Sequence, residues 1–507
     1  MTKIVTFNPS ALDKMRTGIN IVADAVGKTI GPRGTNVFID NEVQPKFTND
    51  GHSIAHHITL SDKLENAGAW VVRNACAQTN DDAGDGTTTT AVLLRAIIDE
   101  CLARPENKVQ IMQSLMEAKK KVLKELKKQA KPIKQEDVIS VARISAENEM
   151  LAQLVTEVIG KVGPKAVITV EDRQDGFESD YKLVQGYEAH VGFMSPYFRN
   201  DPNKARALYT HIPVLCTAKR MGTVNDLKFF DKLAKEGINE LVIVAEEIEP
   251  SILGIFVATK ISGKMNLLVI KAAGPLLEDI AAATGATLIS DETGVNFENF
   301  EVKHLGKADK VICEEKKTIF TSGAPSAKKQ ADRLELFAND NPNQFEAKRL
   351  RERAAKLKGG IAVIRIGAHT DAERNYLRDK ADDTVHSVQS ALEEGVVAGG
   401  GMALYNIASK SKGKTIGDSI LRVSLTAPLR RIIENAGKDY AQILTNLPEG
   451  QGYDAKKDCY SDFFKEGILD PLKVERAALE NSIATAAHFI TTHCAITDYV
   501  EPPKEKA

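Results

Sequence analysis

Residues 81–90 read DDAGDGTTTT and run directly into the periodic segment AVLLRAIIDECL, residues 91–102. The period predicts a helix that begins near Thr87, with Asp85 and Gly86 at its N-terminus. Glycine lets a ligand approach the backbone closely, and the first turn of a helix offers unpaired N–H groups and a positive dipole end. The four threonine hydroxyls add donors, and Asp85 can hold a cation that accompanies a phosphate. We therefore favour a phosphate–Mg²⁺ site over the alternative of a simple polar helix cap, for which one such residue suffices.

The composition describes an ordinary globular protein of several domains. The chain has 507 residues, too many for one hydrophobic core, with 43% hydrophobic and 27% charged residues. The formal net charge of −2 gives no electrostatic case for binding nucleic acid or an anionic membrane. No stretch approaches 18 uninterrupted apolar residues, so we expect no membrane association.

The cysteines predict neither a zinc site nor a disulfide framework. Six cysteines are scattered along the chain without a CxxC pair. Buried free thiols in a reducing compartment are the default interpretation, and the N-terminus has no apolar targeting region. We therefore expect a cytoplasmic protein.

The pattern along the chain predicts helical ends around a mixed middle. Residues 10–130 are mainly helical, including helices over 11–29, from about Ser61 and from Thr87, with short strands at 36–40 and 46–48. A further helical part covers 135–162. From Ala166, short β-rich runs alternate with helices, which predicts an α/β domain with at least partly parallel strands. Helices at 344–358 and 371–392 follow, and the last hundred residues are again helix-rich.

Common nucleotide-binding motifs are absent. Gly27-Lys28-Thr29 and Gly413-Lys414-Thr415 resemble the end of a P-loop, but Val22 and Ala408 stand where its first glycine is required. The run at 399–401 lacks the GxGxxG spacing. Other fragments have the chemistry to complete a nucleotide site, although each alone has an ordinary structural interpretation. They are the turn TIGPRG at 29–34, Asn49-Asp50-Gly51, Gly399–Gly401 and the helical acids Asp382-Asp383.

Five long segments carry a family resemblance. They are VADAVGKTIGPRGTNVFID (22–40), NDGHSIAHHITLSDKLENAGA (49–69), NDDAGDGTTTTAVLLRAII (80–98), LEEGVVAGGGMAL (392–404) and EGILDPLKVERAALENSIATAAHFITT (466–492). In this order and at nearly this spacing they resemble the group I chaperonins (GroEL type), and matching stretches run from about Asp13 to Asp498.

The resemblance implies a multidomain α/β chaperonin fold. A mainly helical equatorial ATPase domain would comprise 1–131 and 396–507, a hinged intermediate domain 132–186 and 360–395, and an α/β apical domain 187–359. Glycines at 186, 359-360 and 395 and Pro132 fall at these junctions. From the sequence alone, ordinary turns explain these residues. The resemblance favours hinges instead.

The resemblance also implies the residues of an ATP site. Asp383 would position the attacking water, Asp50 would act near the γ-phosphate, and Asp85 would bind Mg²⁺, with K⁺ as an optional ion. The remaining nucleotide-binding residues would be Thr29, Ile30, Gly31, Pro32, Gly86, Thr87, Thr88, Thr89, Gly400, Tyr453, Ala455, Ile468 and Asp470. Two departures stand beside them. Asn49 replaces a family lysine, and Asp454-Ala455-Lys456 replaces Asn-Ala-Ala beside the adenine.

A client-binding surface is implied for the apical domain. Its residues would be Phe193, Tyr197, Phe198, Leu227, Phe230, Leu253, Phe256 and Val257. Lys228 and Asp231 fall where the family usually has leucines, which makes this groove more polar. For Leu233 and Phe256, packing under the sheet remains an equal alternative.

The resulting hypothesis is an ATP-driven chaperonin that binds non-native polypeptides and promotes their folding through cycling of a ring. The ring would be a homo-oligomer, heptameric, single or double, with a GroES-type co-chaperonin as a further expected partner. The alternative is a ring-forming holdase with weak or no ATP turnover. Asn49 and Lys456 are the residues that suggest this alternative. A nucleotide-using metabolic enzyme has no substrate motif behind it.

Overall fold

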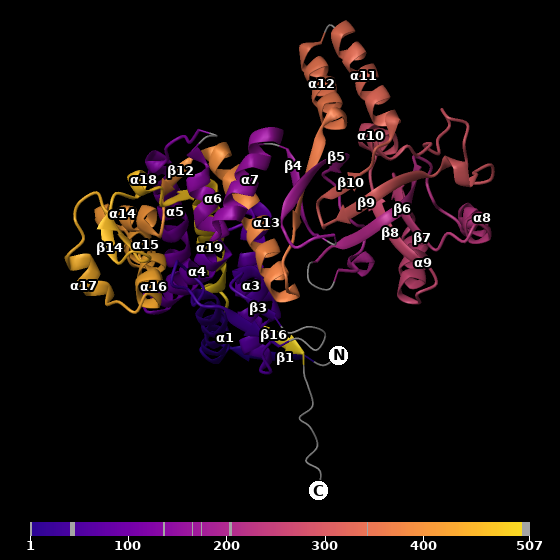
Figure 1. The fold of residues 1–507 in the computed structure, drawn as a ribbon. Coiled ribbons are helices and arrows are strands. Elements are labelled where there is room, and N and C mark those ends of the chain that lie inside the picture. The colour runs from indigo at the N-terminus through magenta and orange to yellow at the C-terminus, as the bar shows by residue number, and fades with distance from the viewer. Residues whose placement is uncertain are drawn as a thin grey trace. The chain divides into compact units, whose positions relative to one another are not determined.

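The computed structural model describes residues 3–40, 46–134, 137–164, 166–173, 175–201, 205–341 and 343–498. The chain forms two compact units (Figure 1). Unit 1 combines Met1–Lys165, Val170–Asp180 and Ile364–Ala507, and unit 2 combines Ala166–Thr169 and Tyr181–Val363. Unit 1 is therefore built from both ends of the sequence, and unit 2 from the middle.

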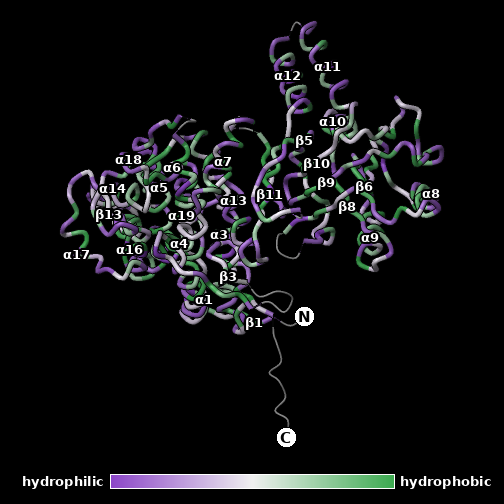
Figure 2. The backbone as a smooth tube through the Cα atoms, in the orientation of Figure 1, coloured by the Kyte–Doolittle hydropathy of each residue, from purple (hydrophilic) through white to green (hydrophobic). Residues whose placement is uncertain are grey.

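The first part of unit 1 is a helical bundle. Its helices are α1 (Ser10–Gly27), α2 (Gly51–His57), α3 (Lys63–Ala83), α4 (Thr87–Leu102) and α5 (Lys108–Gln129). In α1, Leu12, Met15, Ile19, Val22 and Val26 are buried at helical spacing, which places one face of the helix in the core. Hydrophobic and hydrophilic residues alternate along these helices in Figure 2, as this amphipathic arrangement requires.

The last part of unit 1 completes the same core. It contributes α14 (Met402–Lys410), α15 (Ile416–Ser424), α16 (Ala427–Asn435), α17 (Tyr440–Thr445), α18 (Phe463–Glu466) and α19 (Leu472–Phe489). One hydrophobic cluster joins Ile97 and Leu115 from the first part to Leu404, Leu421 and Ile483 from the last. Each large apolar side chain buried there contributes about 1.5–3 kcal/mol.

Between these parts, unit 1 contains α6 (Ile139–Ala146), α7 (Glu149–Val162) and the long α13 (Asp371–Glu394). The helical part predicted over 135–162 is thus two helices, separated by Glu147 at φ 50° and by Asn148, which caps α7. Gln135 and Glu136 lie outside the described residues. Thr370 caps α13 by accepting the Glu373 N–H.

Short two-stranded antiparallel sheets connect distant segments of unit 1. They pair β1 (Lys3–Phe7) with β16 (Cys494–Asp498), β2 (Val37–Ile39) with β3 (Lys46–Thr48), β12 (Val396–Ala398) with β15 (Leu469–Pro471), and β13 (Gly452–Asp454) with β14 (Cys459–Ser461). The β12–β15 pair matters for the site below, because it sets Gly399 beside Asp470.

An eight-stranded sheet has the order β4-β11-β5-β10-β9-β6-β7-β8. Its strands are β4 (Val167–Asp172), β5 (Asp180–Ala189), β6 (Ala207–Thr217), β7 (Glu240–Ala245), β8 (Asn266–Lys271), β9 (Gly306–Cys313), β10 (Thr318–Thr321) and β11 (Gly360–Ile366). The pairs β6–β7 and β7–β8 are parallel, whereas β6–β9, β9–β10 and β10–β5 are antiparallel. The predicted partly parallel α/β domain is thereby confirmed.

The helices of unit 2 are α8 (Phe229–Lys235), α9 (Pro250–Ile261), α10 (Gly274–Thr284), α11 (Pro325–Asp340) and α12 (Gln344–Lys358). Short 3₁₀ turns occur at Pro196–Phe198, Val224–Leu227 and Val302–His304. Helices α11 and α12 lie side by side as a hairpin that extends away from the sheet (Figure 1). Asp279 of α10 is buried and pairs with Arg353 of α12 at 2.8 Å, which fixes the hairpin to the body of the unit.

All six cysteines are free, but only four are buried, since Cys459 is exposed and Cys494 is partly exposed. Within the described part of the chain, no helix is both long and apolar enough to cross a membrane.

Candidate functional site

The loop between α3 and α4 has a backbone that requires glycine. Gly84 has φ 71° and Gly86 has φ 86°, both in the left-handed region, with Asp85 between them. Gly86 occupies the N-cap position of α4, and no described side chain caps this helix. The polar-cap alternative is therefore not what the structure contains, and the N-terminus of α4 remains open to an anion.

Two other segments meet this N-terminus. The Thr29 hydroxyl lies 3.4 Å from that of Thr88, which brings the TIGPRG turn to α4. A Cβ on Gly51 would lie 2.5 Å from the Thr88 hydroxyl oxygen, so only glycine fits there. Next to it, Asp50 caps α2 and accepts from the N–H groups of His52 at 3.1 Å and Ser53 at 2.9 Å.

Helix α13 brings a third acid to the same place. The Ser387 hydroxyl donates to Oδ2 of Asp85, while Oδ1 accepts the Gly86 N–H at 2.6 Å. Asp383 lies one turn before Ser387. Burial raises the pKa of Asp383 well above its usual value, and the negative charges of Asp50 and Asp85 raise it further. These three carboxylates are thus near one another, although they are far apart in the sequence.

This charge arrangement fits a divalent cation bound together with phosphates. In the described part of the chain, no group of three or more His, Cys, Asp and Glu side chains is arranged to hold a metal ion. Mg²⁺ commonly binds through one or two carboxylates plus substrate phosphate oxygens, so a protein cage is not needed. Asp85, fixed by Ser387 and Gly86, is the carboxylate best placed for this.

The predicted base and ribose residues lie on the neighbouring elements. Tyr453 and Ala455 are buried in one apolar cluster, against which Ile30 and Ile468 pack. The Arg33 guanidinium donates to the Lys456 carbonyl at 3.2 Å, which ties the TIGPRG turn to this hairpin.

Asp470 accepts a hydrogen bond from the backbone of Gly400. Among the remaining predicted residues, Thr87 is buried, Gly31 and Thr89 are half-buried, and Pro32 is exposed.

Three residues of this region were not predicted from the sequence. Ser387 and Lys380 lie on α13, four residues after and three residues before Asp383, so helical spacing from Asp383 could have indicated them. Glu475 of α19 is only 5% exposed, and its Oε2 has no hydrogen-bond partner within the described residues. Burial and the adjacent charge of Asp470 raise the pKa of Glu475. Nothing in the pattern KVERAALE distinguishes this buried glutamate from a solvated one.

Comparison with known proteins identifies the family. The profile of the TCP-1/cpn60 chaperonin family matches residues 22–498, nearly the whole chain. The chain belongs to the TCP-1/cpn60 chaperonin family. The predicted multidomain α/β chaperonin fold is confirmed with it.

Solved structures of similar fold include the chaperonin gp146 from the bacteriophage EL 2 (Pseudomonas aeruginosa). One crystal form matches this chaperonin with a TM-score of 0.66 and 21% identity, over 98% of this chain and 100% of that one. A second form matches with a TM-score of 0.62 and 20% identity, over 98% and 99%. Both gp146 crystals were obtained in the presence of ATP-BeFx.

Unit 2 of this chaperonin contains the predicted client-binding residues, and they differ in exposure. Phe198 and Phe256 are fully buried in the core of the unit, as is Leu233, so the packing alternative holds for Phe256 and Leu233. Tyr197 is exposed. The partly buried members that pack against the core are Phe193, Leu227, Phe230, Leu253 and Val257.

Other apolar side chains nearby are more accessible than most of those predicted. Val224, Ile255 and Ile261 are exposed on and beside α9 and the 3₁₀ turn before α8. Phe198 and Phe256 therefore offer no surface in this structure, and the exposed apolar surface of the region is formed by these neighbours with Tyr197.

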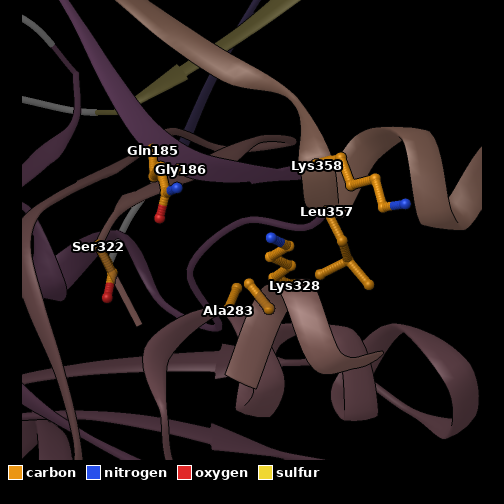
Figure 3. A pocket seen from close by; sticks show the side chains of 8 residues that line it. Gln185, Gly186, Ala283, Ser322, Lys328, Leu357 and Lys358 are labelled. Carbon is orange, nitrogen blue, oxygen red and sulfur yellow. The ribbon is translucent and has the colours of Figure 1, made fainter. Parts of the chain in front are cut away.

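Two cavities of the chaperonin lie away from these residues. One, of about 290 Å³, is in unit 2, where Lys328 and Leu357 from α11 and α12 face Gln185 and Ser322 (Figure 3). The other, of about 470 Å³, is in unit 1 among α1, α4, α15 and α16, with Asp24, Arg95 and Arg431 in its wall. Neither is lined by a predicted nucleotide residue.

Proposed function

We propose that this chaperonin hydrolyses ATP at the N-terminus of α4 and uses hydrolysis to alternate between binding and releasing non-native polypeptides. The observation that carries the proposal is the convergence of Asp50, Asp85 and Asp383 on an uncapped helix N-terminus. Three acids close together are electrostatically costly unless a cation joins them, and the open N–H groups suit phosphate.

Each residue then has a specific role. The backbone and hydroxyls of Thr87, Thr88 and Thr89 hold the phosphates, and Asp85 would hold Mg²⁺, which supplies neutralising charge. Asp383 orients the attacking water and accepts its proton, and Asp50 acts beside the γ-phosphate.

Separate elements bind the nucleoside. Asp470 and Gly400 hold the ribose side. Ile30, Tyr453, Ala455 and Ile468 form the apolar surface for the adenine, supported by their common cluster.

Coupling to motion follows from where Asp383 lies in the chain. Under the proposed three-domain division, α13 belongs to the intermediate segments 132–186 and 360–395, whereas α4 belongs to the equatorial segments. Hydrolysis would then proceed only while α13 is closed onto the α3–α4 loop. The hydrogen bond from Ser387 to Asp85 represents this closed arrangement.

The polypeptide partner is recognised by apolar contact. Non-native chains expose side chains that native proteins bury, and the exposed Tyr197, Val224, Ile255 and Ile261 offer matching surface. A homo-oligomeric ring and a GroES-type lid complete the proposal as family expectations.

The decisive experiment compares steady-state ATP hydrolysis by the wild type and Asp383→Ala. Loss of the general base lowers kcat by about 100-fold or more while nucleotide binding is kept. Asp382→Ala, the adjacent acid on the same helix, is the matched control and keeps a near wild-type rate. Refolding of an aggregation-prone client is followed in parallel.

A wild type that hydrolyses ATP no faster than Asp383→Ala, yet still suppresses aggregation, would establish the holdase instead. The replacement of a family lysine by Asn49 is what keeps this second function in consideration.

A further inference from the structure

Lys380 is an ammonium group in a mostly buried position beside Asp383. Its side chain is 12% exposed and its Nζ lies 2.7 Å from Oε1 of Glu147. Three residues apart on α13, Lys380 and Asp383 share one face of the helix. Burial lowers the pKa of Lys380, but the negative charges of Glu147 and Asp383 outweigh it and raise that pKa overall. Lys380 is therefore charged.

Glu147 is held in an unusual backbone conformation for this contact. It has φ 50°, in the left-handed region where a helix normally ends with glycine or asparagine. Its carboxylate accepts from Lys380 through Oε1 and from the Tyr376 hydroxyl through Oε2, the latter at 3.3 Å. The corner between α6 and α7 is thus tied to α13 by two side chains.

The same network reaches the segment that carries Asp50. The Tyr376 hydroxyl also hydrogen-bonds the side chain of Asn49. Asn49 is the position where the sequence lacks the family's lysine. Its amide instead connects the turn before α2 to α13, on the side of the site that Lys380 occupies.

The charges facing Asp383 are unevenly distributed. Asp50, Asp85 and Asp379 are negative, and Lys380 is the positive group that acts on Asp383. A general base must be ionised to accept a proton, and three neighbouring acids oppose its ionisation. One buried ammonium at this position offsets part of that repulsion.

We propose that Lys380 is the positioning residue of Asp383. Its ammonium, held by Glu147, whose carboxylate also accepts from the Tyr376 hydroxyl, keeps the Asp383 carboxylate ionised. The inference rests on the proposed ATPase function, because Asp383 is given its role there.

The test is the pH dependence of kcat for ATP hydrolysis by the full-length protein. In Lys380→Met, loss of the positive charge moves the acidic limb of the profile upward by about one pH unit, with KM changed little. In Glu147→Gln, loss of the negative charge beside Lys380 moves the same limb downward. Lys380→Arg keeps the wild-type limb.

Opposite shifts separate this electrostatic role from a structural one, which would lower kcat at every pH in both variants. The matched control is Arg378→Met, which removes a similarly buried cation from the same helix. Arg378 pairs with Asp172 of β4 at 3.1 Å.

Superimposable acidic limbs in wild type, Lys380→Met and Glu147→Gln would overturn the inference, as would an equal shift in Arg378→Met. If Lys380→Met does not fold, the direction in which Glu147→Gln moves the acidic limb decides alone. Glu147 is half exposed, so its replacement leaves the fold intact. A wild type without hydrolysis at any pH overturns the proposed function itself, and this inference with it.

Discussion

Ser387 shows how a single hydroxyl can connect two distant segments at the residue scale. It lies on α13, is fully buried, and donates to the carboxylate of Asp85 in the α3–α4 loop. Outer partners of this kind fix the orientation of a metal-binding group. The sequence indicated Asp85 and Asp383 by their resemblance to the family, but a serine gives no such signal until the helix is placed.

We predict that Ser387→Ala weakens Mg²⁺ use. Without the hydroxyl, Asp85 loses one of its two fixed hydrogen bonds, so the Mg²⁺ concentration for half-maximal ATP hydrolysis rises about tenfold. The measurement is a Mg²⁺ titration of hydrolysis at saturating ATP. Ser390→Ala, a buried serine one turn further along α13, is the control and keeps the wild-type titration.

A second prediction at this scale concerns Glu475. Burial and Asp470 raise its pKa from 4.5 to about 8. The folded state therefore keeps a proton that the unfolded state loses, and folding stability falls as the pH rises from about 4.5 to about 8. Glu475→Gln removes this loss.

The stabilisation of Glu475→Gln relative to wild type should accordingly be larger at pH 8.5 than at pH 5, by about 4 kcal/mol. Differential scanning calorimetry at the two pH values measures it as a widening Tm difference. Glu480→Gln, at a partly buried acid of the same helix that pairs with Arg476 at 3.1 Å, serves as control. An equal Tm difference at both pH values would contradict the raised pKa.

At the scale of elements, the sequence was informative where a helix has one apolar face and clear ends. The predicted helix at 344–358 has the observed bounds of α12, and 371–392 is two residues short of α13. The sequence did not predict the break between α6 and α7. Glu147 adopts a left-handed conformation there, and no glycine or proline at this position indicates it. The order β5-β10-β9-β6 depends on long-range pairing that no local pattern contains.

The α3–α4 loop supports an element-scale prediction. A Cβ on Gly84 would lie 2.2 Å from Cγ of His386, so Gly84→Ala must displace α13 from the loop. Gly437→Ala is the matched control, because Gly437 has the same φ of 71° with nothing within 4 Å. Both variants carry the backbone strain of about 1–2 kcal/mol, and only Gly84→Ala adds the clash.

The expected result is a lower Tm for Gly84→Ala than for Gly437→Ala, together with a loss of ATP hydrolysis confined to Gly84→Ala. Equal hydrolysis in the two variants would show that α13 need not approach this loop.

At the scale of the whole molecule, apolar side chains on two of the small sheets of unit 1 remain exposed. Phe38 and Phe47 face each other across β2–β3 and are 54% and 62% exposed, and β1 and β16 expose Phe7 and Ile496. Isolated two-stranded sheets with such surface are stable when another chain covers them. They are the surfaces we expect to join subunits of a ring.

We predict that replacing both Phe38 and Phe47 by serine converts the ring to smaller species in native mass spectrometry. Phe345→Ser, at an exposed phenylalanine of α12 in unit 2, leaves the assembly intact. Should the double variant keep the wild-type mass, the ring contacts lie elsewhere, and a monomeric wild type would refute the ring.

The division of unit 1 between the two ends of the sequence also governs how the chain is synthesised. The ribosome delivers α1 to α5 first, yet the cluster around Ile97 and Leu115 needs Leu421 and Ile483 to close. All of unit 2 leaves the ribosome before those partners exist. The nascent chaperonin therefore carries an open apolar core through the translation of nearly 200 residues of unit 2, and in that interval it is itself a non-native polypeptide of the kind it is proposed to bind.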